Sequence, residues 1–153
     1  MELVLWRHAD AEMGVMDMKR ELTEKGRKQA GRVARWLRPR LEGHWEVLSS
    51  PAVRARQTAD ALGLAYDVRL ALGLSTTEEA LIREAGWPAN DRNVIIVGHQ
   101  PTLGRLAARL LTGHLGDLAF KKGAVWWFSG RLDRNAGLSE TILRAVIAPD
   151  LAD

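Results

Sequence analysis

The chain carries three short apolar runs, ELVLW at residues 2–6, EVLSS at 46–50 and NVIIVGH at 93–99, and each precedes a turn and a helical pattern. Such alternation of strands and helices is typical of a mainly parallel sheet. Two later runs, AVWWFSG at 124–130 and TILRAVIA at 141–148, have no helix between them. We expect these two to pair antiparallel at one edge of the sheet. The pattern predicts an α/β fold of three layers, with a mixed, mainly parallel sheet and helices on both of its faces.

Four helices are predicted between these strands. The first begins at Thr23, whose hydroxyl can accept a free backbone N–H, and runs to about Leu41. The other three are expected over residues 52–62, 76–85 and 101–111, with a short strand around 68–74.

Two features lie outside this regular pattern. Residues 10–21 form the longest unpatterned segment and are predicted to be a loop beside the end of the first strand. The first helix carries a basic stripe, which we interpret as a solvated face, made of Lys25, Lys28, Arg32 and Arg35.

Composition limits the classes of protein to consider. The chain has 153 residues, 46% of them hydrophobic, and no cysteine, which predicts one globular domain over residues 1–153 and excludes thiol nucleophiles and disulfides. No apolar run approaches the roughly 18–20 residues of a membrane helix, so we expect no membrane association and a cytoplasmic location. The 22 basic against 19 acidic side chains favour anionic ligands, and nothing in the sequence points to a nucleic acid.

Unusual polar residues stand where the predicted strands end. The first strand ends in Arg7 and His8, and the third apolar run ends in His99. Arg54 lies in the first turn of the helix that follows the second run, closer to the strand end than Arg56, which we interpret as solvated. Because ligands of open α/β sheets bind at the carboxyl ends of the strands, we expect these imidazoles and guanidiniums to converge.

Gathered cations repel one another unless an anion lies among them, and phosphate is the anion that fits best. Guanidinium groups match phosphate oxygens in pairs, helix N-terminal N–H groups add donors, and histidine can act as a nucleophile. No paired carboxylates with metal-ligand spacing lie nearby, so we expect neither a metal nor another cofactor. A metal-free covalent mechanism remains.

Four segments of the chain resemble a known family. In order, the chain contains segments similar to the four signature segments of the histidine phosphatase superfamily, and its RHADAE form and short length look most similar to the small SixA-type phosphohistidine phosphatases. The resemblance implies a phosphoglycerate mutase-like fold, with His8 as the nucleophile that becomes phosphorylated and Arg7, Arg54 and His99 as the groups that bind the phosphoryl group. The segments are LVLWRHADAE, LTEKGRKQAGRVARWL, VLSSPAVRARQTA and VIIVGHQPTLGRLA.

The sequence departs from the family pattern at two places. Ala9 follows the nucleophile where relatives often have Gly, a small-for-small change. Gly73 stands near the position where many relatives carry an acidic proton donor, and Glu78 and Glu79 come later, on a predicted helix. Asp10 is a possible proton donor or, equally, a carboxylate that caps its loop.

The missing acid favours a phosphoramidate substrate, because a phosphorylated imidazole is intrinsically labile whereas a phosphate ester releases a poor leaving group. The first hypothesis is therefore a phosphatase that removes phosphate from phosphohistidine on a protein partner. Two alternatives stay open, namely a phosphatase of small phosphate esters and a module that only binds phosphate or phosphoproteins.

Overall fold

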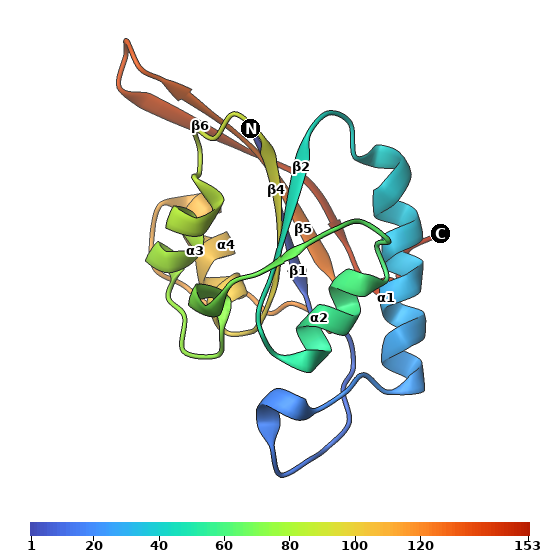
Figure 1. Ribbon diagram of the computed structural model, residues 1–153. Helices are drawn as coiled ribbons and strands as arrows, with labels where there is room; N and C mark the ends of the chain where they lie inside the picture. Colours follow the sequence, from blue (N-terminus) through green and yellow to red (C-terminus); the bar gives the residue numbers. More distant parts are fainter.

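The computed structural model describes the backbone of residues 1–153 and every side chain except that of Leu138. Six strands form one sheet in the order β3-β2-β4-β1-β5-β6 (Figure 1). The strands are β1 (Glu2–Arg7), β2 (Trp45–Ser49), β3 (Asp67–Val68), β4 (Asn93–Gly98), β5 (Val125–Asp133) and β6 (Leu138–Ile147). The helices are α1 (Glu24–Leu37), α2 (Val53–Asp60), α3 (Glu78–Ala85) and α4 (Thr102–Thr112), with short 3-10 turns η1 (Asp17–Lys19), η2 (Arg38–Arg40), η3 (Leu70–Leu72) and η4 (Pro149–Leu151).

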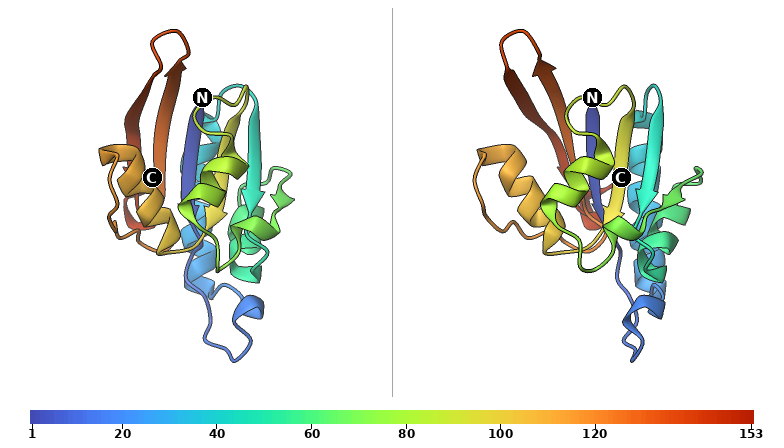
Figure 2. Two further views of the ribbon diagram at one scale, coloured as in Figure 1. Left: turned by 90° about the vertical axis from the view of Figure 1, so that its left-hand side faces the viewer. Right: turned by 60° about the vertical axis from the view of Figure 1, so that its left-hand side comes forward.

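Helices cover both faces of the sheet, as Figures 1 and 2 show. On one face α1 and α2 pack Val33, Leu37 and Ala59 against alternate strand residues such as Val4 and Ile95. On the other face α3 and α4 pack their own apolar side chains against the intervening strand residues, among them Leu81, Leu103, Leu106, Leu5 and Ile96. Because successive side chains of a strand point to opposite faces of the sheet, each face has its own apolar core. The three-layer α/β architecture predicted from the sequence is confirmed.

The sheet is mixed as predicted. β4 pairs parallel with both β1 and β2, whereas β1 pairs antiparallel with β5, and β5 with β6. The carboxyl ends of β1, β2 and β4 consequently lie at one edge, beside the loop of residues 10–21 (Figure 1). No helix in the described part of the chain is long and apolar enough to span a bilayer.

The end of the first helix differs from the prediction. Thr23 caps α1 as expected, since its hydroxyl accepts the N–H of Gly26 at 2.9 Å. However, α1 ends at Leu37 rather than near Leu41, and the 3-10 turn η2 takes over. Pro39 is the physical reason, because proline lacks the N–H that would continue the helix.

The short strand expected in the apolar stretch around 68–74 lies at its start, and the polar stretch between the two last apolar runs is more ordered than a turn. β3 holds only Asp67 and Val68, and the chain then enters η3. The polar stretch of residues 131–140 is mostly strand, in which Arg131 pairs with Glu140 across the hairpin. A solvated two-stranded ladder needs no apolar pattern, so its polar sequence looked like a turn.

A close approach between α1 and the segment after β1 yields a stability prediction. A Cβ built on Gly26 would lie 1.9 Å from the carbonyl oxygen of Asp10, whereas one on Gly31 of the same helix meets only the end of the Arg35 side chain, at 3.5 Å. We expect Gly26→Ala to destabilise the fold by about 1–3 kcal/mol. Gly31→Ala should leave stability unchanged or raise it by up to about 1 kcal/mol. Urea unfolding of both variants checks this, and equal midpoints would contradict it.

Candidate active site

The backbone of His8 is fixed by hydrogen bonds on both sides. Its N–H donates to the carbonyl of Gly98 at 3.1 Å, and its carbonyl accepts the N–H of Gly123, also at 3.1 Å. The indole N–H of Trp6 donates to the Gly123 carbonyl at 3.0 Å, which ties the same loop to β1. His8 therefore sits at a rigid point where β1 ends, between β4 and the segment before β5.

The His8 ring is held in one orientation. Its Nδ1 lies 2.8 Å from the carbonyl oxygen of Ala9, and a carbonyl can only accept, so Nδ1 carries the hydrogen. Nε2 then carries no hydrogen, and its lone pair accepts a hydrogen bond from Arg54 Nε at 3.3 Å. This is the tautomer in which histidine presents a nucleophilic nitrogen.

Arg54 reaches His8 from the first turn of α2 and is almost fully buried. Its two terminal nitrogens donate to the Asp17 carbonyl at 2.8 Å and to the Asp17 carboxylate at 3.2 Å. Thr58 links the same helix to the nucleophile segment, because its hydroxyl donates to the Arg54 carbonyl at 2.8 Å and accepts the N–H of Ala9 at 3.1 Å.

His99 follows β4, and its ring centroid lies 5.3 Å from that of His8. The Oγ of Ser50, at the end of β2, lies 2.7 Å from His99 Nε2 and also accepts the N–H of Ala52. We assign the Ser50 hydroxyl as the donor to Nε2, which places the His99 hydrogen on Nδ1. Nδ1 is buried and has no partner among the described residues.

His8, Arg54 and His99 line a cavity of about 320 Å³. Arg7 lines it from the end of β1 and donates one guanidinium hydrogen to the Phe120 carbonyl at 2.7 Å, while its buried Nε has no partner among the described residues. The structure thus brings four of the sequence-predicted residues together, Arg7, His8, Arg54 and His99. The remaining lining residues are Ala11, Arg20, Leu74, Gln100 and Lys122.

Both histidines of the cavity are neutral near pH 7. The pKa of His8 is lowered to about 4, mainly because the ring is buried. The hydrogen bond to the Ala9 carbonyl raises this pKa, whereas the positive charges of Arg54, Arg7 and Arg20 lower it further. Burial and the neighbouring His8 lower the pKa of His99 to about 3. The positive charge of the cavity therefore resides on the arginines and on Lys122, while the imidazoles supply a lone pair and an N–H.

The predicted proton donor Asp10 does not line this cavity. Its carboxylate accepts the Thr23 hydroxyl at 2.7 Å and forms an ion pair with Lys122 at 2.9 Å, and both contacts lower its pKa. These contacts favour the capping role. Glu78 and Glu79 also lie outside the cavity lining, on α3, where Glu79 pairs with Arg109.

Sequence reasoning missed Ser50 and Asp17. Ser50 comes directly before Pro51 at the end of β2, and its position at a strand end was the available signal. Asp17 lies in the segment 10–21, whose η1 turn gave no periodic pattern. Among the described residues, no group of three or more histidine or acidic side chains is arranged to hold a metal ion. Arg56 is exposed, which agrees with its interpretation as solvated, and the two remaining histidines, His44 and His114, are exposed as well.

Comparison with known proteins shows the family to which the chain belongs. Residues 3–87 match the family description "Histidine phosphatase superfamily (branch 1)". An uncharacterised protein of Picosynechococcus sp. is 35% identical over 144 residues, which cover 82% of each chain. The chain therefore belongs to the histidine phosphatase superfamily, as the resemblance implied.

The more particular likeness is to SixA proteins. The phosphohistidine phosphatase SixA homolog of Haemophilus influenzae is 29% identical over 130 residues, which span 72% of this chain and 77% of that protein. The structure of the protein histidine phosphatase SixA complexed with tungstate superposes with a TM-score of 0.77 at 24% identity and covers 98% of both chains. This second likeness confirms the phosphoglycerate mutase-like fold.

The lowered pKa values of the two histidines predict a pH-dependent stability. Between about pH 6.5 and about pH 4 the unfolded chain binds protons at His8 and His99 that the folded chain does not bind, so acid in this window destabilises the fold. Each histidine contributes a slope of up to about 1.4 kcal/mol per pH unit. Urea unfolding at several pH values should give a shallower slope for His99→Gln and an unchanged one for the exposed His114→Gln. Equal slopes in all three proteins would refute this.

Proposed function

We propose that the chain is a metal-independent phosphatase that removes phosphate from phosphohistidine on a protein, through a covalent intermediate on His8. The observation that carries this proposal is the unprotonated Nε2 of His8, which faces a cationic cavity while Nδ1 is held by the Ala9 carbonyl. We further propose that one domain, residues 1–153, contains the whole machinery.

In the first step Nε2 of His8 attacks phosphorus, and the bond between phosphorus and the substrate nitrogen breaks. If the other ring nitrogen of the substrate is protonated, the leaving imidazole departs neutral and needs no acid from the enzyme. Arg7 and Arg54 balance the charge on the three phosphoryl oxygens, and His99, which lines the same cavity, helps to bind them. Water then attacks phosphorus, the bond to Nε2 breaks, phosphate leaves and His8 returns to its neutral form.

The surroundings of the cavity support a phosphoramidate rather than an ester. An alkoxide leaving group gains from a proton donor, but no carboxyl group is among the residues that line the cavity. Asp10, the nearest candidate in sequence, is kept ionised by Thr23 and Lys122. A protein substrate is also compatible with the position of the cavity, since Leu74, Arg20 and Lys122 at its wall lie at or near the surface.

The relatives add support. The homolog from Haemophilus influenzae carries the name of a phosphohistidine phosphatase, and the SixA structure binds tungstate, a tetrahedral oxyanion like phosphate. The alternative, a phosphatase of small phosphate esters on the same residues, would need a proton donor from outside the cavity lining.

The direct test compares hydrolysis of a phosphohistidine-bearing protein with hydrolysis of a panel of small phosphate esters, in the presence of a chelator. We expect the phosphohistidine substrate to be preferred, by kcat/KM, and His8→Ala to be inactive. With a ³²P-labelled substrate the wild-type chain should carry an acid-labile label that His8→Ala lacks. Preference for the esters would establish the alternative, and binding without turnover of either substrate would establish a binding module.

A second test concerns the proton donor. Because the Asp10 carboxylate is ionised, we expect Asp10→Asn to change kcat on both substrate types by less than about 3-fold, as is usual for a group that takes no part in proton transfer. Thr23→Val, which removes one partner of the same carboxylate, is the matched control for local structural damage. A loss of about 100-fold or more confined to esters would show that Asp10 is their general acid.

A further inference from the structure

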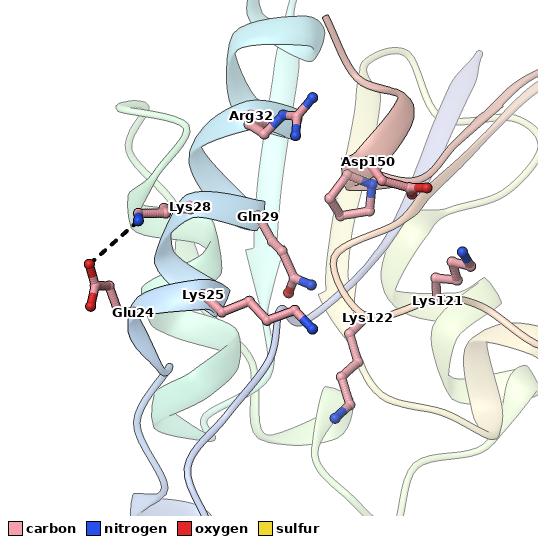
Figure 3. A pocket seen from close by; sticks show the side chains of 9 residues that line it. Glu24, Lys25, Lys28, Gln29, Arg32, Lys121, Lys122 and Asp150 are labelled. Carbon is pink, nitrogen blue, oxygen red and sulfur yellow. Dashed lines mark ion pairs between the residues drawn. The ribbon is translucent and has the colours of Figure 1, made fainter.

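A second and larger hollow adjoins the candidate active site. It has a volume of about 750 Å³ and lies between α1 on one side and the segment of Lys121 and Lys122 with η4 on the other (Figure 3). We call it the basic groove. Its lining residues are Glu24, Lys25, Lys28, Gln29, Arg32, Lys121, Lys122, Pro149 and Asp150.

The basic groove has more cationic than anionic side chains. Five of its lining residues are Lys or Arg and two are Glu or Asp. Lys28 is paired with Glu24 at 3.5 Å and Arg32 with Asp153 at 3.0 Å, both in exposed pairs that contribute little stability. Lys25 and Lys121 form no ion pair with any described residue, and Figure 3 shows Lys25 extending from α1 toward the segment of Lys122.

Part of the solvated stripe on α1 lines the basic groove. Lys25, Lys28 and Arg32 form one wall of the groove, whereas Arg35 lies outside it and lines a neighbouring hollow that Lys28 and Arg32 share. The opposite wall comes from residues almost a hundred positions later in the chain. Cations from two distant segments thus face one hollow, which a solvated helix face alone does not explain.

Lys122 connects the basic groove with the catalytic cavity, because it lines both. A Cβ on the next residue, Gly123, would lie 2.9 Å from Pro149 of η4 and 3.4 Å from Gln29 of α1, and its φ of +77° also favours glycine. Its N–H also donates to the carbonyl of His8. The floor of the basic groove and the backbone of the nucleophile are therefore one packed unit.

We propose that the basic groove docks an acidic segment of the phosphoprotein substrate, next to the phosphohistidine that enters the cavity. This inference rests on the proposed function, and its basis is charge complementarity to carboxylates on the partner. Its lining has no aromatic side chain for base stacking, so a single-stranded nucleic acid fits it less well. Docking would raise the local concentration of phosphohistidine at His8 and add selectivity that the small cavity alone does not provide.

The test uses two phosphohistidine peptides of equal length, one with flanking glutamates and one with flanking glutamines, together with free phosphohistidine. At low ionic strength we expect kcat/KM to be about tenfold higher for the glutamate peptide, and we expect salt to remove the difference as the Debye length falls to about 8 Å and below. The double variant Lys25→Glu/Lys121→Glu should lose this preference. It should hydrolyse free phosphohistidine like the wild type.

The matched control is Arg35→Glu, a charge reversal on the same helix outside the basic groove, which should keep the preference. An equal loss in Arg35→Glu would mean a general charge effect and would overturn the proposal, as would equal kcat/KM for the two peptides. Fluorescence anisotropy of the unphosphorylated glutamate peptide on His8→Ala measures docking without catalysis. If the glutamate peptide binds to His8→Ala but the wild type turns over no phosphohistidine substrate, the proposed function is rejected and the docking proposal stands. If an oligonucleotide binds more tightly than the glutamate peptide, the proposal of an acidic protein partner is rejected.

Discussion

The parallel pairing of β1 with β4 is the constraint on which the site depends. Arg7 stands opposite Gly98, and the N–H of His8 continues the ladder by donating to the Gly98 carbonyl. Since the two strands are ninety residues apart in sequence, only this register brings His8 beside His99. A shift of one residue would turn every side chain of β1 to the opposite face and separate the two imidazoles.

Burial and charge then act in opposite directions on the residues held there. Burial favours uncharged imidazoles, whereas the guanidinium of Arg54 has a partner in Asp17, which accepts two of its hydrogen bonds. The guanidinium of Arg7 has only one carbonyl partner among the described residues. A buried donor without a partner costs free energy, and Arg7 Nε and His99 Nδ1 are two such donors beside the cavity.

The sequence predicted those parts of the molecule that depend on local patterns. Apolar runs marked the strands, Thr23 marked the start of α1, and the strand ends marked Arg7, His8 and His99. It did not predict Asp17, whose contact with Arg54 depends on how the loop folds against α2. Nor could it reveal the basic groove, because Lys25 and Lys121 come from distant segments that line one hollow only in the folded chain. The sequence also did not predict the length of the β5–β6 hairpin, because exposed strands and turns are both rich in polar residues.

The very low pKa values of His8 and His99 have one more consequence. From about pH 6 to pH 8 both imidazoles stay almost entirely neutral, so their contribution to the charge that the cavity offers an anion stays the same. A phosphate group, by contrast, changes its own charge near pH 6. Any acid dependence of phosphate capture in this range would thus report the ionisation of the ligand, and the protein acts as a receptor of constant charge.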